Sequence, residues 1–276
     1  MRLAKLHEIL YRTPLLMKPE TMESILTIFQ QHATLNKDDF QAAREGKDWC
    51  GNNVELEQMT IDGTLAMIPV KGPLGIGLDA FEKGAGATDY QDIMDDIETA
   101  NGNPKVENIL LVMDTPGGMW GGLLECAAAI QDSEKPVYCF VPAGGMVASA
   151  GIFLAAVCAG IFLSPSSQAG SVGVYCAFID TSKIAESRGY KIKVFSSGTY
   201  KGMGFPGTSL STEQEDLLQT QVMDMAEEFY DHMRANRGEI PDDAMQGQMF
   251  RASEAVKLGF ADEVIKDLDT LKEFLG

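Results

Sequence analysis

Short apolar segments alternate with amphipathic ones along most of this chain. This alternation restricts the possible fold classes more than any other feature of the sequence. Asp62 and Gly63 form a hairpin turn signal between two expected strands, residues 54–61 and 65–70. Further strands are expected at 109–113, 137–141, 161–163, 172–178 and 192–195, and helices at 89–99, 123–130, 147–157, 181–187 and 212–236. After residue 251 we expect a helix, a strand and a helix. This alternation predicts an α/β fold with a mostly parallel sheet and flanking helices.

The chain divides into two expected parts. Residues 1–53 have a helical, amphipathic pattern, with Leu15 and Leu16 among the expected contacts. We interpret them as an N-terminal extension that packs on another surface, and residues 54–276 as the main domain. Ser211 and Gln214 have the spacing of a capping box, which predicts that the long helix begins at Thr212.

Charge and cysteine content narrow the function classes. The 40 acidic and 22 basic residues give a net charge of −18, which disfavours nucleic acid as a partner because it repels phosphate backbones. The five cysteines are odd in number and have no CxxC spacing. We therefore expect buried free thiols in a reducing, cytoplasmic compartment, and neither a metal nor a cofactor. The cysteines are Cys50, Cys126, Cys139, Cys158 and Cys176.

One stretch approaches the length of a membrane span. Residues 145–163 are nineteen mostly apolar residues, but many are Ala, Gly or Ser, and Ser164-Pro165 ends the run. We interpret the stretch as a buried helix that leads into a buried strand. The N-terminus is too polar for the apolar region of a signal peptide, so no integral membrane segment is expected.

A glycine-rich turn follows the apolar strand at 109–113. Residues 114–122 read DTPGGMWGG and precede an expected helix. Glycines here leave backbone N–H groups uncovered, and the start of the helix adds a positive dipole end, so the turn suits a developing oxyanion. The alternative is an ordinary tight turn between a strand and a helix.

Ser149 lies in a second such turn, within the small-residue sequence AGGMVASAG at 143–151. Its neighbours are small or apolar, which leaves room for a peptide beside a hydroxyl nucleophile. The alternative is a helix N-cap, a common place for serine.

A serine nucleophile needs a base, and the chain contains only three histidines. His7 and His32 lie in the N-terminal extension, and His232 lies in a polar helix where we expect a solvated side chain. A lysine can act as the base where burial and apolar neighbours keep it neutral. Lys201 is the best candidate because glycine, hydroxyl and apolar residues surround it in SSGTYKGMG at 196–204. The alternative is an exposed loop lysine.

These elements together resemble the signal peptide peptidase A type of serine–lysine peptidases, which have a ClpP/crotonase-like fold. The resemblance covers roughly residues 64–265, with about fifty residues between the serine and the lysine. It implies that Ser149 is the nucleophile, that Lys201 is the base, and that the N–H groups of Gly118 and Ala150 form the oxyanion hole. Gly117 and Ser171 take supporting roles. Ser171 matches a serine that the family places near the lysine, where it would orient the amine, and the alternative is a hydroxyl at the start of a strand. The segments that carry the resemblance are 114–118, the stretch around 149, 170–174, 198–201 and 250–262.

The front of the chain is more similar to the phage-encoded branch of that family. The helical front end that carries this similarity includes Tyr11-Arg12-Thr13-Pro14-Leu15-Leu16-Met17. We expect no N-terminal membrane anchor of the kind typical of cellular members, and the chain carries one Ser–Lys set. This implies a prohead-type protease that cleaves unfolded or extended chains in the host cytoplasm or prohead. Phage scaffold or capsid proteins, or signal-peptide remnants, are then the expected substrates. A ring-like homo-oligomer is also implied, with subunits that can share a catalytic site.

Two other functions stay open from the sequence. A crotonase-type acyl-CoA enzyme would share the fold and the glycine-rich turn, although its catalytic carboxylates have no obvious candidate here. A catalytically silent assembly protein could also use this fold.

Overall fold

The computed structural model describes residues 15–17 and 58–275. The chain forms two compact units. Of the described residues, the larger unit contains 16–17, 58–173 and 229–275, and the smaller one contains Leu15 and 174–228. Most of the expected N-terminal extension, including His7, His32 and Cys50, lies outside the described residues.

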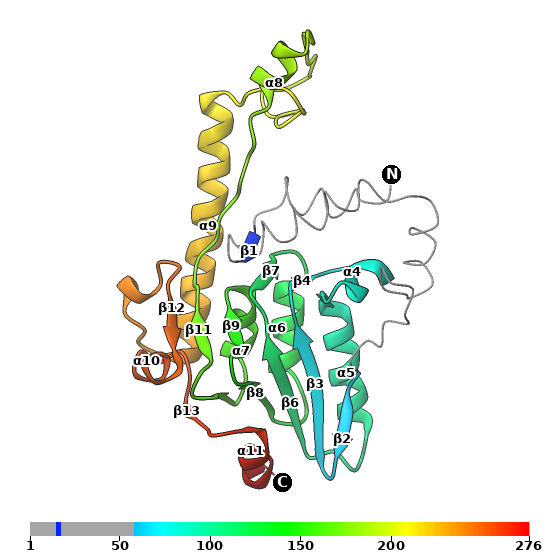
Figure 1. Ribbon diagram of the computed structural model, residues 1–276, viewed down its shortest axis with the longest axis vertical. Coiled ribbons are helices and arrows are strands. Elements are labelled where there is room, and N and C mark those ends of the chain that lie inside the picture. The colour runs from blue at the N-terminus through cyan, green and yellow to red at the C-terminus, as the bar shows by residue number, and fades with distance from the viewer. Residues whose placement is uncertain (1–14, 18–57, 276) are drawn as a thin grey trace. The chain divides into compact units, whose positions relative to one another are not determined.

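A six-stranded sheet organises the larger unit, in the order β13-β10-β8-β6-β3-β2 (Figure 1). All neighbouring strands are parallel except β2 and β3, which pair antiparallel across the turn that contains Gly63, at φ 61°. This confirms the predicted mostly parallel α/β sheet and its first hairpin. The strands are β2 Thr60–Asp62, β3 Leu65–Lys71, β6 Asn108–Asp114, β8 Val137–Val141, β10 Gly160–Leu163 and β13 Glu263–Val264.

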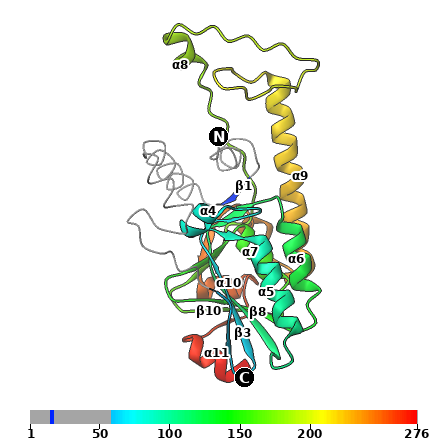
Figure 2. The ribbon, with the colours of Figure 1, turned by 90° about the vertical axis from the view of Figure 1, so that its right-hand side faces the viewer.

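Helices cover both faces of this sheet, which explains why its strands read as continuous apolar runs. Figure 2 shows α5 (Tyr90–Gly102) and α6 (Leu123–Gln131) on one side of β3 and β8, and α11 (Leu268–Leu275) on the other. Leu110 of β6, Phe140 of β8 and Leu271 of α11 belong to one buried cluster.

Two small sheets stand beside the large one. The first has the order β12-β11-β9, in which β9 and β11 are parallel and β12 is antiparallel. The second has the order β1-β7-β4-β5. Leu15 and Leu16, expected in a helix, form part of the strand β1. The strands are β9 Met146–Ala148, β11 Gln168–Gly170, β12 Met249–Arg251, β1 Leu15–Met17, β7 Gly117–Met119, β4 Leu74–Gly75 and β5 Thr88–Asp89.

The stretch 145–163 is part of the folded core of the larger unit. It forms β9, then α7 (Ala150–Ala156), then β10, so the helix expected from residue 147 begins three residues later. In the part of the chain that the structure describes, no helix combines the length and apolarity that a membrane span needs. The remaining elements of this unit are α4 Ala80–Gly84, the 3-10 helix Asp242–Ala244 and α10 Ala252–Lys257.

The smaller unit contains α8 (Ser182–Ser187) and most of α9 (Thr212–Arg237). The predicted capping box is confirmed, because Ser211 and Gln214 exchange hydrogen bonds of 3.1 and 3.4 Å. Neither segment expected as a strand, 172–178 or 192–195, forms one, although Tyr175 in the first makes an isolated β-bridge. An apolar segment becomes a strand only where a partner completes its ladder, and Phe195 of the second segment is 91% exposed.

The cysteines that the structure describes are free, as predicted. Cys126, Cys139 and Cys158 are buried and Cys176 is half-buried. Burial raises the pKa of Cys126 and of Cys158 to about 12, which keeps both thiols protonated and unreactive.

Candidate active site

Ser149 occupies a sharp turn between β9 and α7. Its backbone has φ 55° and ψ −116°, and Ser149 and Ser171 alone among the described non-glycine residues have a positive φ. Such a conformation costs roughly 1–3 kcal/mol and persists only where the surroundings enforce it. Ser149 is 2% exposed and holds the N-cap position, yet within the described chain its side chain makes no capping hydrogen bond. The hydroxyl is therefore not used to stabilise the helix end.

Backbone hydrogen bonds hold Ser149 on both sides. Its N–H donates to the carbonyl of Gly170 at the end of β11, at 3.0 Å. Its carbonyl accepts the N–H of Phe153 in α7, also at 3.0 Å. The strained serine is thus fixed between a strand and a helix, a strand–turn–helix setting found for nucleophilic serines.

Gly117 and Gly118 begin β7, a short strand that lies within the first glycine-rich segment, residues 114–122. Gly117 has φ 103°, a conformation that side chains rarely tolerate. Gly118 pairs with Leu74 of β4, and a Cβ on Gly118 would overlap the Leu74 carbonyl. Gly117 therefore requires glycine because of its backbone conformation, and Gly118 because of the close backbone approach.

Thr115 joins this glycine-rich turn to the strand that precedes Ser149. Its side chain is fully buried, donates to the carbonyl of Gly72 at 2.6 Å and accepts the N–H of Gly117 at 3.1 Å. Its backbone N–H donates to the carbonyl of Met146 at 2.8 Å, and its carbonyl accepts the N–H of Ala148 at 3.1 Å. The two sequence motifs therefore meet in space.

Tyr90 of α5 supports β7. Its hydroxyl donates to the carbonyl of Met119 at 2.8 Å, and burial raises its pKa well above the ordinary value. The proton of Tyr90 therefore remains in place to donate. Nothing in the local sequence pointed to Tyr90, whereas Thr115 stood inside a motif without an assigned role.

Ser171 directly follows β11, and its N–H donates to the carbonyl of Gln248 at 2.6 Å. It has φ 57°. Strands β9 and β11 are parallel neighbours. Ser149 follows the end of β9 and Ser171 follows the end of β11, at the same end of the sheet.

Lys201 belongs to the smaller unit, while Ser149 belongs to the larger one. Lys201 lies in a series of tight turns at 198–205, and its N–H donates to the carbonyl of Gly198 at 3.1 Å. Gln214 of α9 donates its side-chain amide to the carbonyl of Thr199 at 2.6 Å, which ties this loop to the helix. The Lys201 side chain is exposed within the chain.

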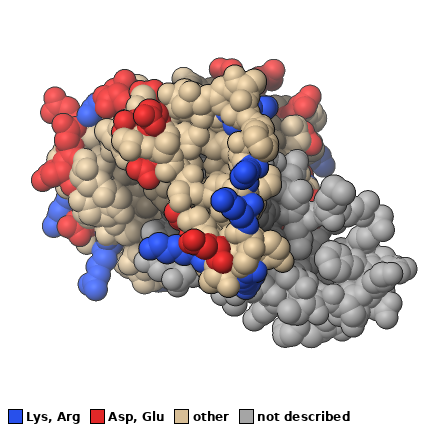
Figure 3. Space-filling view, turned by 90° about the horizontal axis from the view of Figure 1, so that it is seen from above, with Lys and Arg blue, Asp and Glu red and all other residues tan. Residues whose placement is uncertain are grey.

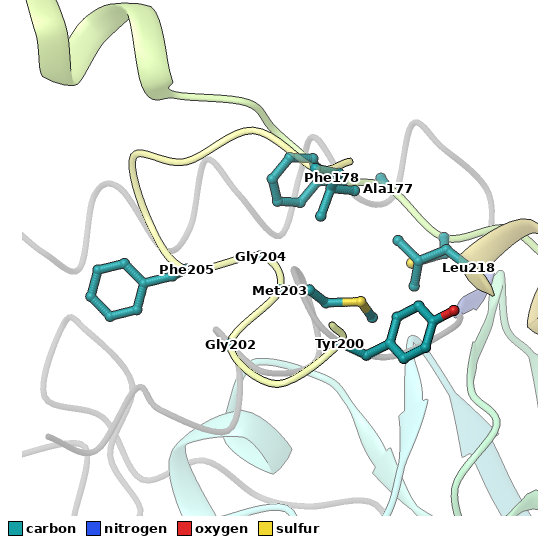
Figure 4. Close-up of a pocket in the computed structure, with 10 residues that line it drawn as sticks. Ala177, Phe178, Tyr200, Gly202, Met203, Gly204, Phe205 and Leu218 are labelled. Carbon is teal, nitrogen blue, oxygen red and sulfur yellow. The ribbon is translucent and has the colours of Figure 1, made fainter. Parts of the chain in front are cut away.

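A cavity of about 360 Å³ lies in the smaller unit beside this loop. Tyr200 and Gly202, the two neighbours of Lys201, are part of its wall. Figure 4 shows the side chains of Tyr200, Met203 and Leu218 grouped at one side of it. Its remaining walls come from Cys176, Ala177, Phe178, Gly204, Phe205 and Leu210, so none of its lining residues is charged.

His232 differs from its expected solvated state. It is half-buried and stacks on the ring of Phe153, with the ring centroids 3.5 Å apart. Burial lowers the pKa of His232, and its hydrogen bond to the Phe153 carbonyl opposes that shift. The sequence prediction missed this position because the polar neighbours of His232 in the chain do not share its face of α9.

A buried serine on a strained strand-to-helix turn, beside a glycine-rich turn, is typical of serine hydrolases. The chain belongs to peptidase family S49, whose sequence profile matches residues 129–274 and so includes Ser149, Ser171 and Lys201. This confirms the resemblance inferred from the motifs.

Relatives with assigned names include two phage proteins. The chain is 30% identical over 213 residues to the capsid assembly protease C of Escherichia phage lambda, covering 75% of this chain and 48% of that protein. It is 27% identical to the head-tail preconnector protein GP5 of Enterobacteria phage P21, covering 75% of this chain and 42% of the relative. The chain thus spans about half the length of these curated relatives. Among solved structures, it is similar to a mutant of ClpP1 from Listeria monocytogenes, with 14% identity, a TM-score of 0.49, and coverage of 74% and 94% of the two chains.

Proposed function

We propose that this chain is a serine endopeptidase in which Ser149 is the nucleophile and Lys201 the general base. The observation that carries the proposal is the backbone of Ser149, a strained conformation at a strand-to-helix turn in a member of a peptidase family. A serine that only capped a helix would need neither the strain nor an unused hydroxyl.

In the proposed reaction, the Oγ of Ser149 attacks the scissile carbonyl while the neutral amine of Lys201 takes its proton. The N–H groups of Gly118 and Ala150 stabilise the oxyanion that forms, and the protonated lysine then passes its proton to the leaving amine. Water attacks the resulting acyl-enzyme and releases the second product. Ala150 is the first residue of α7, and the first N–H groups of a helix have no acceptor inside it.

Gly117 and Ser171 support these groups. The positive φ of Gly117 sets the course of the chain into Gly118. We infer that Ser171 orients the lysine amine, because its strand end is paired with the one that precedes Ser149.

Membership of a peptidase family favours this reaction over that of a crotonase-type enzyme. A catalytically silent assembly protein is the second candidate, because the name of the phage P21 relative describes a head-tail preconnector and no activity.

For the substrate we propose unfolded or extended protein chains. The name of the phage lambda relative states a role in capsid assembly, so a capsid or scaffold protein is the first substrate to test. Figure 3 shows acidic and basic side chains among uncharged ones on the surface of the described residues.

We also propose that the chain acts as a homo-oligomer. The smaller unit exposes large apolar side chains that would be costly to leave in water, and a second copy of the chain is the occupant proposed for them. These are Ile179, Ile184, Tyr190, Val194, Phe195, Tyr200, Phe205 and Met223.

The test is cleavage of a panel of denatured proteins and unstructured peptides by the wild-type chain and by Ser149→Ala. Treatment with a serine-directed fluorophosphonate, followed by mass spectrometry, locates the modified residue. We expect cleavage and modification at Ser149 by the wild type and neither by the variant. Cleavage that survives in Ser149→Ala contradicts the assignment, and a wild type that cleaves nothing favours the silent assembly protein.

A further inference from the structure

Phe153 is the centre of an aromatic cluster one turn into α7, the helix that Ser149 begins. Trp120, just after β7, packs on it edge-on at 6.1 Å between ring centroids. From α9, Phe229 packs at 5.2 Å and His232 stacks nearly parallel at 3.5 Å. All four residues lie in the larger unit. The cluster therefore connects the nucleophile's helix with the strand of the proposed oxyanion donor Gly118 and with α9.

His232 also binds the backbone of Phe153. Its Nε2 lies 2.9 Å from the Phe153 carbonyl oxygen. Because α7 ends at Ala156, this carbonyl is one of the last four, which find no N–H donor further along their own helix. The N–H of Val157, which would reach it in a longer helix, donates to Ala155 instead. The carbonyl can only accept, so Nε2 carries the proton and donates.

Because its carbonyl and ring are held, the backbone N–H of Phe153 is held as well, and this N–H contacts Ser149 directly. The N–H of Phe153 donates to the Ser149 carbonyl, so rotation or fraying of the seven-residue α7 would release the serine. A short helix gains most of its stability from tertiary contacts. The strained φ of Ser149 needs such contacts to persist.

We propose that His232 is a positioning residue, which holds Phe153 and thereby keeps Ser149 and the Ala150 N–H in their reactive geometry. Its effect on the reaction rests on the proposed function, whereas the holding of α7 does not. His232 acts here through its contacts and takes no proton from the substrate or from Ser149.

The experiment separates the ring from the hydrogen bond. His232→Phe keeps an aromatic ring over Phe153 and removes the donor, and His232→Gln keeps a donor at a similar reach and removes the stack. Ala235→Gln, an exposed position on the same helix, is the matched control. For each variant, kcat and KM on a cleaved peptide, hydrogen exchange of the α7 amides, and the folded fraction by circular dichroism are measured.

We expect His232→Phe to lower kcat about tenfold with KM changed less than about twofold, since one hydrogen bond to a buried carbonyl is lost. Exchange of the α7 amides should accelerate in parallel, His232→Gln should restore part of both, and Ala235→Gln should match the wild type. Wild-type kcat and exchange in His232→Phe would overturn the proposal, as would a fall in kcat that merely follows the folded fraction. If Ser149→Ala retains full activity, the proposed function fails, and the exchange data alone decide whether His232 holds α7.

Discussion

Ser149 and Ser171 each directly follow one member of a register-paired couple, Ala148 of β9 and Gly170 of β11. The N–H of Ser149 donates to the Gly170 carbonyl at 3.0 Å, and both serines have a positive φ, 55° and 57°. Ends of parallel strands are where α/β proteins place reactive groups, because side chains and loops leave the sheet there together. The two strained serines therefore lie side by side at the carboxyl ends of β9 and β11, in the small sheet β12-β11-β9.

The first prediction separates strain from chemistry at Ser149. Ser149→Ala and Ser149→Gly should both lose peptidase activity, by about a million-fold if the serine acts as in other serine peptidases. Ala keeps the Cβ that makes φ 55° costly, whereas Gly adopts this conformation freely, so the Gly variant should unfold at the higher temperature. Thermal unfolding by circular dichroism measures the difference. A less stable Gly variant would show that the turn is not strained.

The second prediction concerns Gly118. A Cβ at this position overlaps the Leu74 carbonyl, so Gly118→Ala must move β7 away from β4. We expect kcat to fall at least about a hundredfold, as for the loss of one oxyanion donor, together with a lower unfolding temperature. Gly102→Ala is the control, because a Cβ there meets nothing within 4 Å. Peptidase kinetics and unfolding temperatures on both variants decide, and an active Gly118→Ala would remove Gly118 from the oxyanion hole.

The sequence predicted the parallel sheet well because its core strands are unmixed apolar runs. In 109–113 every residue is apolar, and β6 is indeed central and covered on both faces. The expected strand at 192–195 was wrong because periodicity reports apolar character alone and not the presence of a partner strand. Val194 and Phe195 are instead exposed within this chain.

The residues of the site also divide into those that the sequence revealed and those that it did not. The motifs around Gly118 and Ser149 could be recognised, since glycine and small residues in strand-to-helix turns have a backbone cause. Tyr90 and His232 could not be found, because each acts through a backbone carbonyl distant in sequence, at Met119 and Phe153. Every residue has a backbone carbonyl, so the identity of Met119 or Phe153 does not reveal that its carbonyl accepts a hydrogen bond from a distant side chain.

The third prediction is a pH dependence of stability at His232. Burial lowers the folded-state pKa of His232 below the value of about 6.5 expected in the unfolded chain, so the unfolded state binds more protons in that window. Its contribution is therefore fully present above about pH 6.5 and is lost as pH falls toward the folded-state pKa. The unfolding temperature of the wild type should drop more than that of His232→Gln between about pH 7.5 and about pH 5.5. Equal decreases in the unfolding temperatures of the wild type and His232→Gln would contradict a lowered pKa of His232 in the folded protein.

The fourth prediction concerns the proposed base. Lys201→Arg should be inactive although it keeps the positive charge, because a guanidinium stays protonated and cannot accept the serine proton. Lys193→Arg, at an exposed lysine of the same unit, should retain activity. Both variants should unfold at the wild-type temperature, since Lys201 is exposed within the chain. A Lys201→Arg protein with near wild-type kcat would exclude lysine as the base.

The last prediction tests whether neighbouring subunits share one site. Ser149 and Lys201 belong to different compact units of the chain, and the smaller unit exposes a series of large apolar side chains. If a second copy covers those side chains, the lysine of one chain can serve the serine of another. Ser149→Ala and Lys201→Ala, each inactive alone, should then regain activity when they are mixed after dissociation and reassembly. With random exchange, about a quarter of the sites receive both intact residues, so recovery should approach that fraction of the wild-type rate. Light scattering before and after mixing establishes that oligomers exist. Oligomers that exchange subunits without any recovery would place both residues of a site in one chain, and a fully active monomer would exclude the shared site and the proposed assembly together.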